Sequence, residues 1–201
     1  MRILVLYHSV TGNTYRMARL AAEGAREAGA EVSVKTVPEL VPEQSIQADE
    51  SLRKARDEQA DVPIASTEEL PDYDGIIVGT PTRFGNMSAQ MRNFWDQTGG
   101  LWMQGALIDK PVGLFCSTAS MHGGQETTLV SSMMTFIHHG MIVVGVPYSV
   151  QELVTTQSGG TPYGASHVSG HPPTVPITEE EAVICRALGR RVAEVAAKLA
   201  A

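Results

Sequence analysis

The chain has 201 residues, a length that suits one domain with a full hydrophobic core. Its formal net charge of -7 provides no basic surface for a polyanion, so we expect no nucleic-acid partner. The two cysteines, Cys116 and Cys185, are too few for a disulfide framework or an iron–sulfur cluster, and their apolar surroundings predict packed free thiols. Because the first predicted strand begins at residue 2 and no apolar run is long enough to span a bilayer, we expect no signal peptide, no membrane insertion and a cytoplasmic location.

The first motif is a strand followed by a polar loop and a helix. Residues 3–7 are an unbroken apolar run, typical of a parallel strand covered on both faces, and small and apolar residues recur at helical spacing from Thr14 to Gly29. The loop between them places backbone N–H groups, hydroxyls and an amide at a helix N-terminus, which favours an anion. This loop consists of Ser9, Val10, Thr11, Gly12, Asn13 and Thr14. It lacks Lys and Arg, the P-loop sequence and the dinucleotide glycine pattern, so a phosphate monoester fits best; an ordinary capped turn is the alternative.

A second strand is predicted at residues 31–37, where polar and apolar residues alternate up to Pro38. Residues 38–70 then interrupt the pattern with three prolines and a charged segment, residues 49–61, that has helix-forming composition but no clear apolar face. We interpret this excursion as a solvated surface loop with room for one helix. A role in assembly is the alternative.

Two further strands run into polar loops. The apolar strand at residues 73–79 leads to the loop Thr80, Pro81, Thr82, Arg83, Phe84, Gly85 and Asn86, and a helix follows with Met87, Met91, Phe94 and Trp95 on its core face. The apolar strand at residues 112–116 leads to the loop Ser117, Thr118, Ala119, Ser120, Met121, His122, Gly123 and Gly124. The three polar loops thus follow the first, third and fourth strands.

The rest of the chain supplies a helix, a fifth strand, a long loop and a closing helix. One helix carries Val130, Met133, Met134 and Ile137 on one face, and residues 141–144 form the fifth strand. Residues 145–177 are rich in Gly, Pro, Ser and Thr and are expected to be an ordered loop or flap. Thr178 and Glu181 have the spacing of a capping box at the start of the last helix, whose buried stripe includes Ile184, Leu188, Val192, Val195 and Leu199.

Strands alternating with helices predict an α/β fold: a doubly wound, five-stranded parallel sheet in the flavodoxin-like order 2-1-3-4-5, with helices on both faces. Residues 1–201 would form one domain with excursions at about 38–70 and 145–177. In this order the three polar loops meet at the carboxyl edge of the sheet, around the point where the strand order reverses. One loop suits a monophosphate and another offers Arg83 and Phe84 to a flat polar heterocycle, so flavin mononucleotide (FMN) is the most economical ligand.

Several long motifs resemble those of the WrbA family of flavodoxin-like, FMN-dependent NAD(P)H:quinone oxidoreductases. They are residues 80–88 (TPTRFGNMS), 99–102 (GGLW), 123–126 (GGQE), 138–141 (HHGM) and 159–165 (GGTPYGA), in the order found in the family. The resemblance covers essentially the whole chain. It implies a homotetramer with one FMN per subunit, which accepts hydride from NADH or NADPH and passes two electrons to a quinone in the same pocket by turns.

The resemblance also assigns roles to individual residues. The cofactor-binding residues would be Ser9 to Thr14 at the phosphate, Thr80 to Asn86 along the isoalloxazine, Ser117 to Gly123 at its edge, and His138 facing the flavin. The substrate pocket would include Trp102, Phe84, His138, Tyr148 contributed by a neighbouring subunit, and Thr11, where many members carry an aromatic that contacts the nicotinamide nucleotide. For His122 a surface-loop position is favoured, and for His138 the alternative is a complement to a helix dipole.

Mechanistically, FMN would supply the hydride chemistry, and Arg83 would stabilise negative charge on the reduced ring unless it only pairs with a neighbouring carboxylate. No acid–base catalytic residue and no metal ligand is assigned. Two other function classes stay open: a flavodoxin-like electron carrier without its own substrate, and a noncatalytic binding protein. Against the carrier stand a moderate charge and extra loops better suited to enclosing a pocket. Against the binding protein stands the lack of a recognition helix or peptide groove.

Overall fold

The structure is a computed structural model that describes residues 1–200, and its centre is a parallel β-sheet. The strands are β1 (Arg2–Tyr7), β2 (Glu31–Thr36), β3 (Gly75–Pro81), β4 (Pro111–Thr118), β5 (Ile142–Val144) and β6 (Ala165–Val168). They follow the order β2-β1-β3-β4-β5, and β6 also pairs with β4. The predicted order of the five strands is therefore confirmed, with a sixth strand added.

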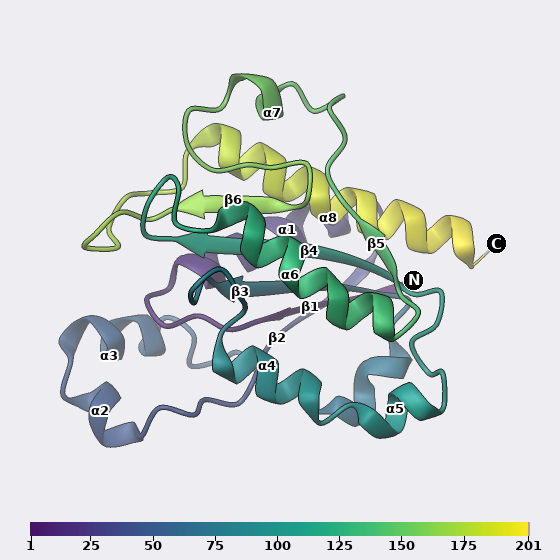
Figure 1. Ribbon diagram of the computed structural model, residues 1–201, viewed down its shortest axis with the longest axis horizontal. Helices are drawn as coiled ribbons and strands as arrows, with labels where there is room; N and C mark the ends of the chain where they lie inside the picture. The colour runs from purple at the N-terminus through teal and green to yellow at the C-terminus, as the bar shows by residue number, and fades with distance from the viewer. Residues whose placement is uncertain (201) are drawn as a thin grey trace.

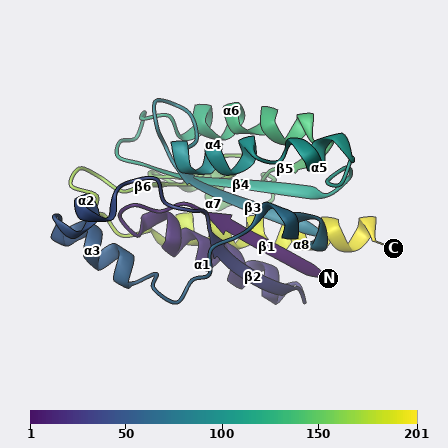
Figure 2. The same cartoon turned by 90° about the horizontal axis from the view of Figure 1, so that it is seen from below.

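Helices cover both faces of this sheet (Figure 2). One face carries α1 (Asn13–Glu27) and α8 (Glu179–Leu199), and the other carries α4 (Ala89–Asp96), α5 (Gly99–Met103) and α6 (Gln125–His138). The strands are apolar on both sides because successive side chains point into two different cores. Val5 packs with α1 and α8, whereas its neighbour Leu4 packs with α4 and α6.

The far edge of β4 is shared by two short strands. β5 pairs with β4 from Pro111 to Gly113, and β6 pairs with it from Phe115 to Thr118. The segment between β5 and β6 leaves the sheet and contains the short helix α7 (Glu152–Thr155). The prediction that residues 145–177 form only a loop or flap was therefore wrong: β4 is longer than β5, and its free edge binds residues 165–168 although these have no apolar run.

Residues 38–70 contain more helix than predicted. Two short helices, α2 (Glu43–Gln47) and α3 (Glu50–Asp57), precede a 3₁₀ helix, η1 (Thr67–Asp72). Asp49 caps α3, since its carboxylate accepts the backbone N–H of Ser51 at 2.8 Å. α2 and α3 lie at the end of the molecule toward which the strands point, beside the loop that follows β6 (Figure 1).

The last helix closes the α1 side of the sheet. Its predicted capping box is confirmed: Thr178 Oγ1 accepts the N–H of Glu181, and the Glu181 carboxylate accepts the N–H of Thr178. Ile184, Leu188 and Val192 of the predicted stripe are fully buried. Within residues 1–200 no helix combines the length and the apolarity needed to cross a membrane.

Candidate functional site

Four loops at the carboxyl edge of the sheet enclose a cavity of about 410 Å³. Three of them are the polar loops predicted from the sequence, after β1, β3 and β4, and the fourth follows β6. The cavity is lined by Val10, Thr11, Asn13, Thr14, Pro81, Thr82, Arg83, Phe84, Ser117, Thr118, Ala119, Ser120, Gly123, Ser169, Gly170, His171 and Pro173. Its volume lies within the range of small-molecule and cofactor sites.

The loop after β1 presents an anion-binding helix terminus to the cavity. Gly12 has a φ of +83° and provides no side-chain cap for α1, whose first turn contains no acidic residue. The first intrahelical hydrogen bond runs from Arg16 N–H to the Gly12 carbonyl, so the N–H groups before it have no helical partner. Ser9 Oγ is buried and has no hydrogen-bond partner among residues 1–200. These unpaired donors suit a phosphate group.

Asn13 connects this loop to the loop after β6. Its side-chain amide donates to the Pro173 carbonyl at 3.2 Å, and its carbonyl oxygen accepts from Arg16 Nη1 at 3.0 Å. Arg16 in turn pairs with Glu58, the residue that follows α3, at 3.1 Å. The loop after β6 is thus tied to the loop after β1, residues 9–14, hereafter the phosphate loop.

The loop after β3 is a tight turn that displays Phe84. Arg83 and Asn86 exchange two backbone hydrogen bonds, of 2.8 and 3.0 Å, around Phe84 and Gly85, which have φ angles of +51° and +74°. Positive φ is strained for an aromatic residue, and the Phe84 side chain is 100% exposed. Arg83 has no carboxylate partner within residues 1–200, and its guanidinium donates to the Thr82 carbonyl at 2.8 Å. An exposed ring and a guanidinium without a carboxylate partner in residues 1–200 therefore line the cavity.

The loop after β4 turns sharply through its hydroxyl groups. Thr118 Oγ1 donates to the Ser120 carbonyl at 2.9 Å, and the Gly123 N–H donates to the same carbonyl at 3.0 Å. Ser117 to Ser120 face the cavity, whereas Met121 and His122 line a separate hollow with Glu126. This loop thus gives the cavity one polar side.

A buried network supports these loops from behind. Glu39 accepts a hydrogen bond from His8 Nε2 at 3.1 Å, and Ser88 Oγ lies 3.0 Å from His8 Nδ1. The predicted site residue Thr80 belongs to this network, because its hydroxyl accepts the Ser88 N–H at 2.9 Å. Burial raises the pKa of Glu39, but the hydrogen bonds from His8, the Val41 N–H and Gln90 hold it well below its usual range.

The predicted site residues fall into four groups. Most line the cavity, whereas Met121 and His122 line the separate hollow beside Glu126. Ser9, Gly12, Thr80, Gly85 and Asn86 support its loops without lining it. Trp102, His138 and Tyr148 lie elsewhere: Trp102 and His138 share a second cavity of about 430 Å³ between α4, α5 and α6, and Tyr148 is exposed in the turn after β5. One chain therefore does not bring these three residues to the loops.

The sequence reasoning missed the fourth loop, which contributes Ser169, Gly170, His171 and Pro173. No local sequence signal marks this loop, because the strand that it follows, β6, has no apolar run. Beneath this loop, His167 and Glu181 form a buried pair that the sequence analysis also missed.

The cavity fits flavin mononucleotide. The unpaired Ser9 hydroxyl and the free N–H groups of the first turn of α1 match a terminal phosphate, and Phe84, Arg83 and the polar edge at Ser117 to Ser120 match a flat heterocycle. No group of three or more His, Cys, Asp or Glu side chains that could hold a metal ion occurs in the described part of the chain. The fold and the site together define a flavodoxin-like, FMN-binding oxidoreductase.

Comparisons with known proteins agree with this class. Residues 1–153 match the model of the family described as NADPH-dependent FMN reductase. Proteins named NAD(P)H dehydrogenase (quinone) are similar over nearly their whole length: one from Aromatoleum aromaticum is 46% identical, covering 99% of this chain and 97% of the relative, and one from Rhizobium johnstonii is 50% identical, covering 99% of both. The chain belongs to this flavodoxin-like family of NAD(P)H dehydrogenases (quinone), which includes WrbA.

Solved structures show the same fold. A WrbA-like flavodoxin from Agrobacterium tumefaciens superposes with a TM-score of 0.68 at 25% identity and covers 98% of both chains. Oxidised flavodoxin 2 from Bacillus cereus superposes with a TM-score of 0.61 at 18% identity, covering 99% of both. The first likeness extends to sequence, and the second concerns the fold alone.

Proposed function

We propose that this chain is an FMN-dependent NAD(P)H dehydrogenase that reduces quinones to hydroquinones by two electrons, with the nicotinamide and the quinone using one pocket by turns. The observation that carries this function is the cavity at the N-terminus of α1, where unpaired phosphate donors and the exposed Phe84 ring occur together. FMN supplies the hydride-transfer chemistry when bound.

The protein's part is to bind and orient the flavin and to polarise its ring. Residues 9–14 would hold the phosphate by neutral donors, and the turn at Phe84 would offer an aromatic face and the Arg83 cation to the flavin ring. A cation close to the ring favours the negative charge that develops on reduction. The hydrogen bond from the Thr118 hydroxyl to the Ser120 carbonyl fixes the loop after β4, which would also contact the flavin.

We propose further that four copies of the chain assemble and complete one another's substrate pockets. Trp102, His138 and Tyr148 lie away from the FMN cavity of their own chain, so they serve a flavin site only if a second copy approaches it. On the apolar face predicted for α6, Val130, Met134 and Ile137 are 40–53% exposed, and Met134 lines one cavity with the exposed Trp102 of α5. An apolar surface of this kind supports burial between subunits. Both cysteines are free, as predicted, which agrees with a reducing compartment such as the cytoplasm.

The test is a spectrophotometric assay of the purified chain after its bound flavin has been identified. NADH or NADPH oxidation should be slow alone and should accelerate when benzoquinone is added. An electron carrier would contain FMN but show no quinone-dependent oxidation of either nucleotide. A noncatalytic binding protein would oxidise neither nucleotide, with or without benzoquinone and added FMN. The electron-carrier result and this result would each contradict the proposal.

A further inference from the structure

A further cavity of about 520 Å³, hereafter the side cavity, adjoins the FMN cavity at the phosphate loop. Thr11 and Asn13 line both cavities. The side cavity is otherwise lined mainly by α3 and by residues 172–177 of the loop after β6, which Figure 1 shows at the same end of the molecule. Among residues 1–200, no residue of the loops after β3 and β4 lines it. The side cavity therefore lies on the phosphate side of the FMN site.

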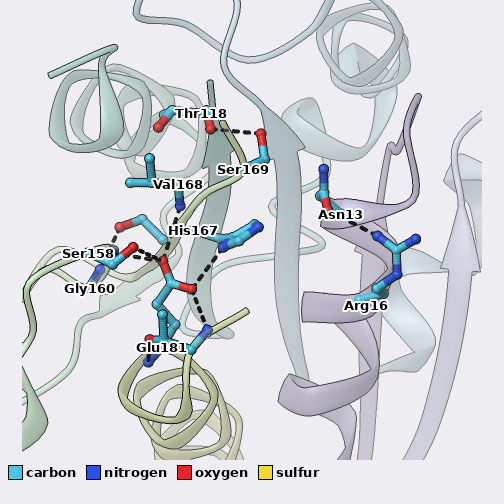
Figure 3. A network of polar contacts seen from close by, with 12 residues as sticks. Asn13, Arg16, Thr118, Ser158, Gly160, His167, Val168, Ser169 and Glu181 are labelled. Carbon is cyan, nitrogen blue, oxygen red and sulfur yellow. Dashed lines mark hydrogen bonds and ion pairs between the residues drawn. The ribbon is translucent and has the colours of Figure 1, made fainter. Parts of the chain in front are cut away.

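The side cavity carries more positive than negative charge. Its ionisable lining residues are Arg16, Lys54 and Glu58. The Arg16 guanidinium donates to Asn13 Oδ1 at 3.0 Å, as Figure 3 shows, and it pairs with Glu58 at 3.1 Å. Lys54 has no carboxylate partner within residues 1–200. The side cavity thus contains one cation whose charge is not compensated.

Most of the remaining lining is apolar and rigid. It consists mainly of small and branched aliphatic side chains and three prolines: Ala55, Pro172, Pro173, Val175, Pro176 and Ile177. An apolar surface with a few polar groups is typical of a small-molecule site. A ligand that suits this cavity has a flat apolar part and an anionic group, and the adenosine phosphate end of a dinucleotide has both.

The position of the side cavity selects one end of a nicotinamide dinucleotide. Hydride transfer to the flavin requires the nicotinamide to lie against the flavin ring, which the article's FMN site assigns to the loops after β3 and β4. These loops do not line the side cavity within residues 1–200, so only the adenosine end of the dinucleotide can occupy it. NADH and NADPH differ only at that end, where NADPH carries a 2′-phosphate in place of a hydroxyl.

We propose that the side cavity binds the adenosine end of the nicotinamide dinucleotide and that Lys54 pairs with the 2′-phosphate, so that this chain prefers NADPH to NADH; the inference rests on the function proposed above. The FMN phosphate is served by the neutral donors of the phosphate loop, which leaves the Lys54 ammonium for a second phosphate. An ammonium–phosphate hydrogen bond is charge-assisted, whereas the ribose hydroxyl of NADH offers only a neutral acceptor. Because Lys54 is exposed, salt screens this attraction, and the preference falls as ionic strength rises.

The experiment first uses two nucleotide fragments that differ only in the 2′-phosphate. FMN-loaded, full-length protein is titrated with adenosine 2′,5′-bisphosphate and with adenosine 5′-monophosphate by calorimetry, for the wild type, Lys54→Gln and the control Arg53→Gln. Arg53 precedes Lys54 on α3 and is not part of the lining. The wild type and Arg53→Gln should bind the bisphosphate about tenfold more tightly than the monophosphate, and Lys54→Gln should bind the two equally.

Steady-state kinetics with benzoquinone give a second measurement. Lys54→Gln should raise the KM for NADPH about tenfold, because it loses the partner of the 2′-phosphate, and should leave the KM for NADH and the kcat with either nucleotide as in the wild type. Arg53→Gln should match the wild type with both nucleotides. Since Lys54 is exposed and has no carboxylate partner in residues 1–200, its replacement should not disturb the fold.

Equal affinity of the wild type for the two fragments, or a preference that Lys54→Gln retains, would overturn the inference. Release of FMN during titration with the bisphosphate would show competition for the phosphate loop, and a lower FMN content of purified Lys54→Gln would show that Lys54 serves the flavin phosphate; each result would also overturn it. A wild type that oxidises neither NADH nor NADPH with benzoquinone would instead overturn the proposed function, and the fragment titrations would still decide whether Lys54 recognises the 2′-phosphate.

Discussion

Gly12 and Gly29 have nearly the same left-handed backbone, with φ angles of +83° and +84°, at opposite ends of α1. Their surroundings differ. A Cβ atom on Gly12 would lie 2.9 Å from an Arg16 guanidinium nitrogen, whereas a Cβ atom on Gly29 would have no atom within 4 Å. Gly12 is part of the phosphate loop, and Gly29 lies outside it. The same substitution at both positions therefore separates the cost of backbone strain from an effect on ligand binding.

Gly12→Val should therefore abolish FMN binding, and Gly29→Val should keep it. Both variants should lose roughly 1–2 kcal/mol of unfolding free energy, since a branched residue is strained at positive φ. In Gly12→Val the side chain also crowds Arg16 and Glu58, and Arg16 bonds Asn13 in the same loop, so the phosphate donors would be displaced. Circular dichroism melts report the stability and visible absorbance reports the flavin. A Gly12→Val protein with full flavin content would show that this loop is only a turn.

The protein should bind FMN more tightly than FAD. The N-terminus of α1 suits a terminal phosphate, and the loop after β1 lacks the glycine pattern of dinucleotide-binding sites. Fluorescence titration with the two flavins measures the preference. Tighter binding of FAD would mean that the phosphate lies outside this loop.

The hydrogen-bond network of Glu39 and His8 behind the loops predicts that the difference in stability between the wild type and Glu39→Gln depends on pH. The folded pKa of Glu39 lies below its unfolded value, so its charge stabilises the fold above about pH 4.5, and this contribution is lost as the pH falls toward the folded pKa. Glu39→Gln places an amide among donors and should be less stable than the wild type at pH 7. The gap should narrow progressively below about pH 4.5, because the Glu39 carboxyl of the unfolded wild type takes up a proton there while that of the folded protein stays ionised, which favours unfolding.

The control for this prediction is Glu43→Gln, a change at a carboxylate on the exposed helix α2 that accepts only from Gln47, at 2.7 Å. Denaturant unfolding of the three proteins between pH 7 and pH 3 measures the differences. Glu43→Gln should track the wild type at every pH. A gap between Glu39→Gln and the wild type that stays constant with pH would show that the charge of Glu39 does not contribute.

Local sequence patterns were sufficient to predict the five strands and three of the four loops at the site. Unbroken apolar runs such as residues 3–7 and 112–116 occur because these strands are buried on both faces. The capping box was readable because Thr178 and Glu181 interact across one helical turn. In each case the cause of the structure lies within a few residues of the pattern.

Structure that depends on distant partners could not be predicted in the same way. β6 forms because β5 ends at Val144 and leaves an edge of β4 unpaired, which residues 165–168 do not reveal by themselves. His167 is polar and fully buried, and its position is explained only by Glu181, fourteen residues later in the chain. Trp102, His138 and Tyr148 were assigned from a family resemblance, and one chain leaves them apart from the cavity.

Activity and assembly should therefore be coupled. If Tyr148 and Trp102 complete the pocket of another subunit, dilution into dimers or monomers should lower quinone reductase activity more than FMN occupancy, because the phosphate loop lies within one chain and the substrate pocket does not. Sedimentation at falling protein concentration, with activity and flavin content measured in parallel, tests this.

The surface variant Met134→Glu should shift assembly to higher concentration, since it places a charge on the outward apolar face of α6. Arg53→Glu on α3, away from that face, is the matched control and should assemble like the wild type. A fully active monomer would contradict the shared pocket and leave the segments at 38–70 and 145–177 as parts of a single-chain enzyme.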